Sequence, residues 1–325
     1  MRMKRLKTDG EGYYHLMSRC ALKQFLFNDV EKQAFCTMLR RVAAFSGIEV
    51  LTYCVMSNHF HLLVHVPRPQ EIDESELLRR VGLLYGQERE NAMRERWNQY
   101  RKFGWKRLLE KEHSQLRARM GDISPFMQIL KQRFTIWYRA RTPGHEGTLW
   151  QGRFTSTLVE GGGSLVAVGA YIDLNPVRAG IVSDPKDYRF SGYGAAISGD
   201  ATAQAGLCEL YGDSPQPFQK VAEAYRALLY LKGSASMSPE EVRQVLKKRG
   251  HLPLPQLLRC RVRALNSGLA IGSKKFVAGI FATHRYAFSE RRKHVATGEN
   301  LCPSWDGIQL CSVRKLRKQP ITFSN

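Results

Sequence analysis

The sequence lacks the features that mark secreted and membrane proteins. Its basic start, MRMKRLKTDGEGYYH, has no apolar segment of the kind that a signal peptide needs. No apolar run approaches the roughly 18 residues that cross a bilayer. The 7 cysteines are odd in number and scattered, and none forms a CxxC pair, which argues against a zinc ribbon or a disulfide framework. We therefore expect a protein of the reducing cytoplasm without a membrane partner.

Acidic residues are also scarce. The 325 residues include 50 Lys and Arg against 29 Asp and Glu, which gives a net charge of +21. A positive field of this size favours a polyanionic partner, and nucleic acid is the first candidate. Hydrophobic residues make up 43% of the chain, enough for a core, and the length suggests two domains or one domain with additions. A basic protein without a nucleic-acid partner remains the alternative at this stage.

The hydrophobic pattern of the first part of the chain predicts an α+β, ferredoxin-like fold. Short β-rich segments alternate with segments that carry apolar residues at helical spacing. The order strand-helix-strand-strand-helix-strand-helix forms an antiparallel sheet with helices on one face. The segments are residues 12–20, 30–45, 48–55, 59–66, 124–141, 148–160 and 165–174.

Two other regions interrupt or follow this pattern. Residues 69–120 are dense in charge and in helix formers, which predicts two or three amphipathic helices inserted into the domain. Residues 195–206 read as a linker. We therefore expect one domain over residues 1–194 and a basic, mostly helical accessory or DNA-binding region over residues 195–325.

The C-terminal region carries much of the positive charge. Residues 236–325 hold 17 basic against 5 acidic residues. The pattern of residues 265–281 predicts a helix, a glycine-containing turn and a second helix. The pattern of residues 238–249 predicts another helix. Lys274 and Lys275 are candidate DNA contacts in this region.

The stretch MSNHFHLLVHVP contains the first candidate functional residues. Side chains alternate along a strand, so His59, His61 and His65 share one face while the opposite face is wholly apolar. Two neighbouring imidazoles on one face, about 6.5–7 Å apart along the strand, can converge on one metal ion. A half-buried strand with polar residues on its solvated face also explains the pattern.

The stretch AYIDLNPVRAGIV contains the second set. Tyr171 and Asn175 lie four residues apart, and so on one face of a helix, which Pro176 is expected to end or kink. A phenol and an amide oxygen would then point the same way at a helix end. A core tyrosine and a helix-capping asparagine are the ordinary structural explanation.

Combined, these residues suggest a metal-assisted phosphodiester reaction. Two neutral imidazoles, from His59 and His61, and the amide oxygen of Asn175 suit a divalent ion such as Mn²⁺ or Mg²⁺ and leave positions open for a phosphate oxygen. The ion would polarise the scissile phosphodiester, and Tyr171 would be the covalent nucleophile. A free phenol has a pKa of about 10, so Tyr171 would need activation, most simply by the nearby metal.

The stretches HFHLLV, LWQGRF, YIDLNPVRAGIV and DPKDYRFSGYG occur in this order. Together they resemble the REP-associated tyrosine transposases, which are IS200-like members of the HUH single-strand nuclease superfamily. The resemblance runs from about Tyr13 to Tyr193, with the insertion as its main interruption. It implies a ferredoxin-like fold and a DNA strand transferase that cleaves and rejoins single-stranded DNA near hairpins through a 5′-phosphotyrosine, with Mg²⁺ or Mn²⁺.

The resemblance also implies roles for individual residues. His59 and His61 match the metal-binding pair, Tyr171 matches the nucleophile, and Asn175 lies where the third metal ligand is placed. His65 is on the same face but further along the strand, and we do not expect it to be a ligand.

Other implied roles concern the DNA. Arg153 and Arg178 are expected to bind phosphate or to support their loops. The implied partner is single-stranded or hairpin DNA on the bacterial nucleoid, and a homodimer is left open. Two rival functions remain: a non-catalytic DNA-binding regulator on the same fold, and an RNA-binding module that uses aromatic residues on a sheet.

Overall fold

The computed structural model describes residues 5–8, 10–212, 217–230, 268–285 and 311–314. Its centre is one six-stranded sheet with the strand order β2-β3-β1-β4-β5-β6. None of the helices in these ranges is long and apolar enough to cross a membrane. The strands are β1 (Gly12–Arg19), β2 (Glu49–Val55), β3 (His59–Val66), β4 (Thr155–Val159), β5 (Gly268–Gly272) and β6 (Cys311–Arg314).

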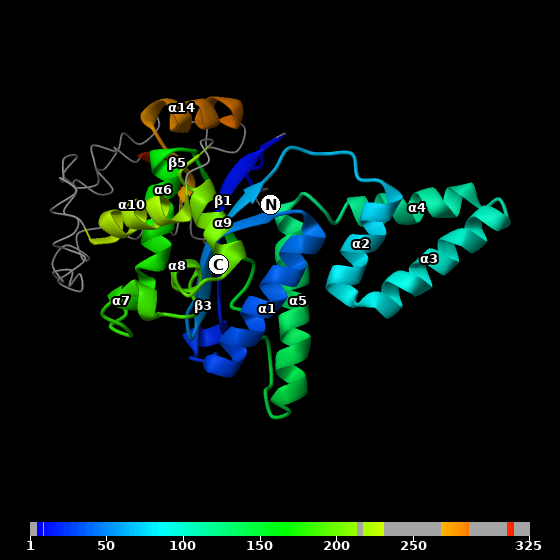
Figure 1. The fold of residues 1–325 in the computed structure, drawn as a ribbon, viewed down its shortest axis with the longest axis horizontal. Helices are drawn as coiled ribbons and strands as arrows, with labels where there is room; N and C mark the ends of the chain where they lie inside the picture. Colours follow the sequence, from blue (N-terminus) through cyan, green and yellow to red (C-terminus); the bar gives the residue numbers. More distant parts are fainter. Residues whose placement is uncertain (1–4, 9, 213–216, 231–267, 286–310, 315–325) are drawn as a thin grey trace, which may run out of the picture.

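The first four strands form the predicted ferredoxin-like arrangement (Figure 1). β1 lies between β3 and β4 and is antiparallel to both, and β2 is antiparallel to β3. Helix α1 (Asp29–Ser46) connects β1 to β2, and α5 (Ile123–Arg141) precedes β4. This order is the one that a β-α-β-β-α-β unit produces, which confirms the predicted fold class.

Helix α1 shows how local sequence sets an element's ends. The side-chain oxygen of Asn28 accepts a hydrogen bond from the Val30 amide at 2.8 Å, and the Glu31 carboxylate accepts one from the Asn28 amide at 3.1 Å. This reciprocal capping box satisfies free N–H groups at the start of the helix. Gly47 ends the helix with φ 64°, a left-handed conformation that glycine adopts without strain.

One face of the sheet packs on α1 and α5. Phe60 of β3 lies on this face, and its ring centroid is 4.5 Å from that of Phe35 on α1. Phe134 of α5 joins them, with its ring 5.2 Å from Phe35. All three side chains are fully buried. The alternation of β3 therefore predicted this core correctly.

The opposite face is covered as well, which corrects the prediction of helices on one face. Helix α6 (Gly163–Asp173) places Tyr171 against this side of β3, with ring centroids 5.9 Å apart between Tyr171 and His61. The physical reason is that this face also carries apolar side chains: Leu63 is fully buried and Met17 is 7% exposed. A face of that composition needs a covering layer.

Residues 195–206 are not a linker. They form parts of α8 (Gly192–Ile197) and α9 (Ala201–Glu209), and α9 packs on β2. A Cβ atom at Gly206 would lie 2.6 Å from the backbone oxygen of Leu51, so only glycine permits this close approach. The small residues of this stretch suggested a flexible connection, but they instead allow α9 to lie against β2.

The C-terminal region contributes to the same sheet. β5 pairs with β4 in parallel, and β6 pairs with β5 antiparallel, so the sheet is mixed rather than wholly antiparallel. The prediction of a first helix within residues 265–281 is wrong, because GLAIG forms β5; its Ala270 and Ile271 are fully buried beside β4. The second predicted helix is confirmed as α14 (Lys274–Thr283). The helix predicted at 238–249 lies outside the described residues.

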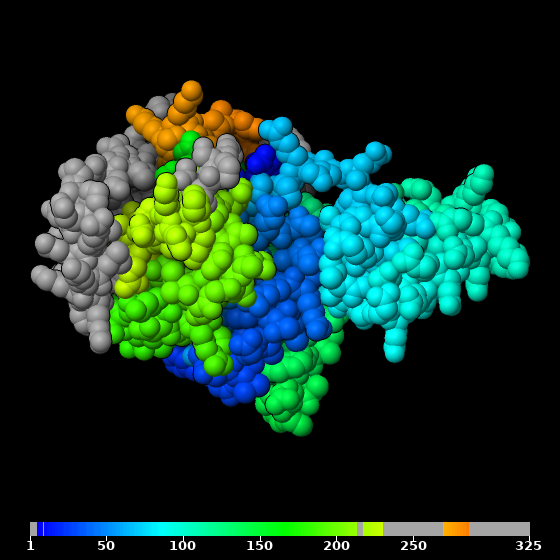
Figure 2. Space-filling model, in the orientation of Figure 1, coloured from blue at the N-terminus to red at the C-terminus, as the bar shows by residue number. Residues whose placement is uncertain are grey.

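The charged insertion folds as three helices, as predicted. They are α2 (Glu74–Tyr85), α3 (Gln87–Lys102) and α4 (Lys106–Arg117). Figures 1 and 2 show them as an arm that projects from the body of the molecule, with the turn between α3 and α4 at its far end. The arm is attached through α2, which packs against α1.

Candidate active site

Strand β3 places three histidines on one face, and the structure separates them into two groups. His61 is 1% exposed, and its ring lies 5.0 Å from the ring of half-buried His59, at an interplanar angle of 85°. His65 belongs to a different cluster at the other end of the strand. The predicted pair is therefore together, with His65 apart from it.

A histidine that the sequence motifs did not single out joins the pair. His15 of β1 is 2% exposed, and its Nε2 lies 2.9 Å from Nδ1 of His61 in a hydrogen bond. The two rings are stacked with centroids 5.1 Å apart. His15 could have been found from the sequence, because alternation along β1 and the neighbouring positions of β1 and β3 in a ferredoxin-like sheet place it on the same face.

The pKa values of both β3 histidines are lowered. Burial lowers the pKa of His59 to about 4, with a further contribution from the positive charge of Arg19. Burial also holds the pKa of His61 well below its usual range, and the neighbouring His15 ring adds to this effect. Both imidazoles are therefore neutral near pH 7, which is the state that a metal ligand requires.

Helix α6 brings Tyr171 to these histidines. The Tyr171 ring is 2% exposed and lies 5.9 Å from the His61 ring and 6.1 Å from the His15 ring, edge to face in both cases. The guanidinium carbon of Arg178 lies 5.1 Å from the centre of the same ring. The structure thus gathers His59, His61, Tyr171 and Arg178 from segments far apart in the sequence.

Asn175 follows Tyr171 at the start of α7 (Asn175–Arg178). Its side-chain Nδ2 donates to the backbone oxygens of Tyr171 at 3.0 Å and Ile172 at 3.1 Å, so it caps the end of α6. Neither of these hydrogen bonds involves a metal-candidate histidine. The Nδ2 atom of Asn175 therefore caps the helix, as the ordinary structural explanation expects. Its Oδ1 atom takes part in neither of these two hydrogen bonds.

Arg178 has a free donor in a buried position. Its Nη1 atom is buried and has no hydrogen-bond partner among the described residues. Buried donors are almost always paired, so such an atom marks a place where a ligand can complete the site. A phosphate oxygen is the natural acceptor for a guanidinium group.

The other predicted DNA contacts lie at the surface. Arg153 is exposed in the loop that precedes β4, and Lys274 and Lys275 are exposed on the first turn of α14. Their roles stay predictions.

His65 is held by carboxylates. Its Nδ1 lies 2.6 Å from Glu49, and its Nε2 lies 3.0 Å from Glu11. Glu209 of α9 approaches to 3.7 Å, and the ring of Tyr13 stacks on that of His65 at 4.6 Å. His65, Glu49 and Glu209 each bring one ligand atom within 4.8 Å of the others. The cluster links β1, β2, β3 and α9.

Comparison with known proteins gives a family match over the segment that carries the histidines. Residues 10–109 match the model of the family described as "Transposase IS200 like", so this segment, which is less than half of the chain, is similar to that family. The matched segment includes His15, His59 and His61 but ends before Tyr171 and Asn175. No curated protein matches the sequence.

Solved structures that this chain is similar to include two described as transposases. One is a REP-associated tyrosine transposase bound to a REP hairpin, 15% identical, with a TM-score of 0.40, covering 61% of this chain and 87% of that one. The other is a candidate transposase from Deinococcus radiodurans, also 15% identical, with a TM-score of 0.25, covering 62% and 98% of the two chains.

Helix α6, which carries Tyr171, is anchored by a buried carboxylate. Asp173 is fully buried and accepts hydrogen bonds from Thr52 of β2 at 2.9 Å and from the Tyr225 hydroxyl at 2.6 Å. Tyr225 lies on α10 (Phe218–Tyr230). The backbone amide of Tyr193 also donates to Asp173, at 3.2 Å. Asp173 therefore joins α6 to β2 and to the C-terminal region.

We expect the contribution of Asp173 to stability to fall as pH rises. Burial raises the pKa of Asp173 from 3.8 to about 7, against the effect of its hydrogen bonds. The folded state then holds the proton more tightly than the unfolded state, so the stabilisation by Asp173 is greatest at low pH and is lost as pH rises to 7. The loss between about pH 5 and 8 should be roughly 2–3 kcal/mol.

Urea denaturation across this pH range measures the effect. Asp173→Asn cannot ionise, so the difference in unfolding free energy between the wild type and this variant should shrink by about 2–3 kcal/mol between about pH 5 and 8. The lowered pKa values of His59 and His61 give an opposite pH dependence, which is the same in both proteins and cancels in the difference. Asp187→Asn, at an exposed site, is the control and should follow the wild type. An Asp173→Asn variant with the wild-type pH dependence would contradict the assignment.

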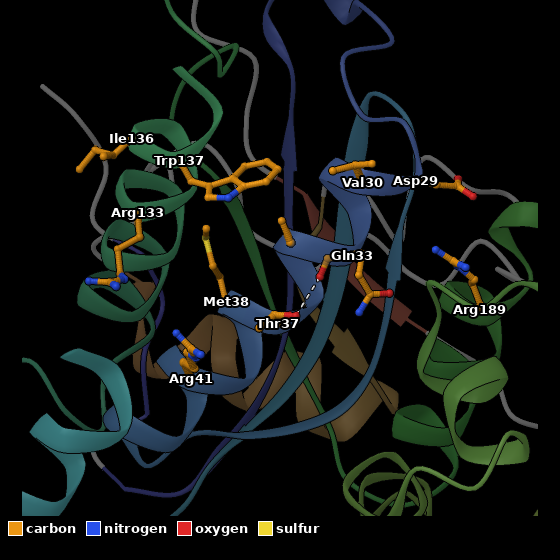
Figure 3. A pocket seen from close by; sticks show the side chains of 11 residues that line it. Asp29, Val30, Gln33, Thr37, Met38, Arg41, Arg133, Ile136, Trp137 and Arg189 are labelled. Carbon is orange, nitrogen blue, oxygen red and sulfur yellow. Dashed lines mark hydrogen bonds between the residues drawn. The ribbon is translucent and has the colours of Figure 1, made fainter. Parts of the chain in front are cut away.

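A groove between α1 and α5 lies on the other side of the sheet (Figure 3). Trp137 and Met38 form part of its lining, with Arg41, Arg133 and Arg189 around it. Neither the histidines nor Tyr171 line this groove. The candidate chemistry is therefore confined to the face that α6 covers.

Proposed function

We propose that this chain is a metal-dependent DNA strand transferase that cleaves and rejoins single-stranded DNA near hairpins, with Tyr171 as covalent nucleophile. One observation carries the proposal: Tyr171 lies against His61 and His15, beneath Arg178. The match of residues 10–109 to the IS200-like transposase family and the net charge of +21 support DNA as the substrate.

The donor set fits a divalent ion. The Nδ1 of His59 lies 2.6 Å from the side-chain oxygen of Asn58, and the Nδ1 of His61 is hydrogen-bonded to His15. With both Nδ1–H groups donated, each Nε2 keeps its lone pair for a metal, and such partners orient the ligand rings. His59, His61 and the Oδ1 of Asn175 would hold Mg²⁺ or Mn²⁺. The bound ion would polarise the phosphodiester and offset charge in the transition state.

The protein residues perform the transfer itself. The phenol oxygen of Tyr171 forms a bond to phosphorus, and the bond from phosphorus to the 3′ oxygen breaks. The phenol loses its proton, the leaving 3′ oxygen gains one, and a 5′-phosphotyrosine results. Arg178 binds the phosphate through its unpaired Nη1 atom. The reverse reaction with another 3′-hydroxyl rejoins the strands without a further energy source.

Access to Tyr171 is the main structural requirement of this proposal. The ring is 2% exposed, with Arg178 above it. DNA binding must therefore move the segment of α7, drawing Arg178 from the ring toward the phosphate. The burial of Tyr171 is also the observation that favours the rival function, a DNA-binding regulator that does not cleave.

A cleavage assay distinguishes the two functions. An end-labelled hairpin with single-stranded flanks, incubated with the full chain and Mn²⁺, should give a free 3′-hydroxyl product and a protein adduct on the 5′ side. EDTA should prevent both, because the ion assists the displacement. A fully paired duplex of the same sequence is the control and should remain intact. Tight binding of the hairpin without cleavage in Mn²⁺ or Mg²⁺ would favour the regulator.

A further inference from the structure

The far end of the arm exposes aromatic side chains. The turn between α3 and α4 has the sequence YRKFGWKR, and Phe103 is 58% exposed and Trp105 49% exposed. Their rings are stacked, with centroids 5.2 Å apart and an interplanar angle of 29°. Figures 1 and 2 show that this turn projects far from the sheet. Large apolar groups grouped on a protruding surface usually mark an interaction site.

These aromatics are not needed for the core of the arm. Trp97 of α3, six residues before Phe103, is fully buried. Its Nε1 donates to Glu112 of α4 at 2.7 Å. The Tyr100 hydroxyl donates to the same carboxylate at 3.1 Å. Glu112 thus ties α3 to α4 just below the turn. Phe103 and Trp105 therefore lie exposed at the end of a helix pair that these hydrogen bonds hold together.

The charge around the aromatics is of one sign. Within residues 100–107 there are four basic side chains, Arg101, Lys102, Lys106 and Arg107, and no acidic one. Arg101 is paired with Glu74. Lys106 and Arg107 are exposed and form no ion pair within the described residues. The tip therefore offers two stacked rings beside cations that are available to an anionic ligand.

We infer that the arm tip is a second DNA-binding site, in which Phe103 and Trp105 stack on unpaired bases and Lys106 and Arg107 bind the flanking phosphates. Stacked aromatic rings beside basic side chains are the combination that binds single-stranded nucleic acid, because every unpaired base has an open π-face. The loop of a hairpin supplies such bases. The choice of hairpin DNA as the ligand rests on the proposed function.

The double variant Phe103→Ser/Trp105→Ser in the full chain tests the aromatic contribution. Fluorescence anisotropy with a labelled hairpin whose loop is unpaired thymines should show affinity weakened about tenfold or more, with the salt dependence unchanged. Binding of a blunt duplex without a loop should not change. Phe25→Ser is the matched control, since Phe25 is 81% exposed on the body of the molecule.

A charge variant tests the phosphate contacts. Lys106→Gln/Arg107→Gln should reduce the slope of log affinity against log salt by about 2, because each phosphate contact contributes roughly one unit. Unchanged hairpin affinity in the aromatic variant would overturn the inference. Formation of a dimer by the wild type but not by the aromatic variant would also overturn it. So would binding of anionic phosphatidylserine vesicles by the wild type alone.

The outcome is separable from that of the proposed chemistry. Cleavage of a short single strand without a hairpin should be the same in the aromatic variant and the wild type, since the arm tip is remote from Tyr171. Suppose that the wild type cleaves no DNA while the aromatic variant binds the hairpin less tightly than the wild type does. That pair of results would contradict the proposed chemistry and would still support the arm-tip site.

Discussion

Replacement of Tyr171 by phenylalanine should abolish the covalent adduct and lower the cleavage rate by roughly three orders of magnitude or more, because the variant lacks the nucleophile. The fold should persist, since loss of one buried hydroxyl costs about 1–2 kcal/mol. The ring that packs on His61, His15 and Arg178 remains in place. DNA binding should therefore match that of the wild type.

The measurement is a denaturing gel of the labelled hairpin after incubation with Mn²⁺, followed by peptide mapping of the adduct. Tyr138→Phe is the matched control, because Tyr138 is also buried but lies on α5, on the other face of the sheet. That variant should cleave normally. An adduct mapped to another tyrosine, or full cleavage by Tyr171→Phe, would overturn the mechanism.

Replacement of His61 by alanine should have the second-largest effect, the loss of metal-dependent cleavage with DNA binding retained. The basic surface would supply the binding energy, whereas the imidazole would hold the metal ion that acts on the scissile phosphate. His59→Ala should give the same result. Because His59 is only half-buried, its replacement should also disturb the core less than that of fully enclosed His61.

His65→Ala is the matched control for this prediction. His65 lies on the same strand and face but is bound by Glu11 and Glu49 rather than placed near Tyr171. Its loss should affect stability and leave cleavage at the wild-type rate per folded molecule. Thermal melts would correct for unfolded protein. Cleavage that persists in His61→Ala and resists EDTA, or that disappears in His65→Ala, would refute the metal assignment.

Elements governed by local rules were predicted well from the sequence. Alternation predicted β3, and helical spacing over residues 30–45 predicted α1 within one residue at each end. The charge pattern of residues 69–120 predicted two or three helices, and the structure has three. In each case the signal lies within one segment, so no knowledge of distant contacts is required.

Elements governed by distant contacts were missed. The stretch around Gly206 is rich in small residues, and only the close approach of α9 to β2 reveals that these residues serve packing. GLAIG is short and apolar, and its strand conformation depends on pairing with β4. Short apolar segments of this kind do not distinguish strand from helix by periodicity.

The candidate site likewise contains residues that local patterns indicate and contacts that they do not. Motif spacing pointed to His59, His61 and Tyr171, which the structure brings together, but their catalytic roles stay predictions. The contact of His15 with His61 requires knowledge of the neighbouring strand, and the bond from Tyr225 to Asp173 joins residues 52 positions apart. No local pattern encodes either contact.

The position of β5 has a consequence for self-association. In a four-stranded ferredoxin-like sheet, β4 is an edge strand whose free N–H and C=O groups can pair with a second molecule. Here β5 occupies that edge, and β6 extends it further. Two copies of this chain therefore cannot form a continuous sheet by joining their β4 strands, and any symmetric dimer must be built on another surface.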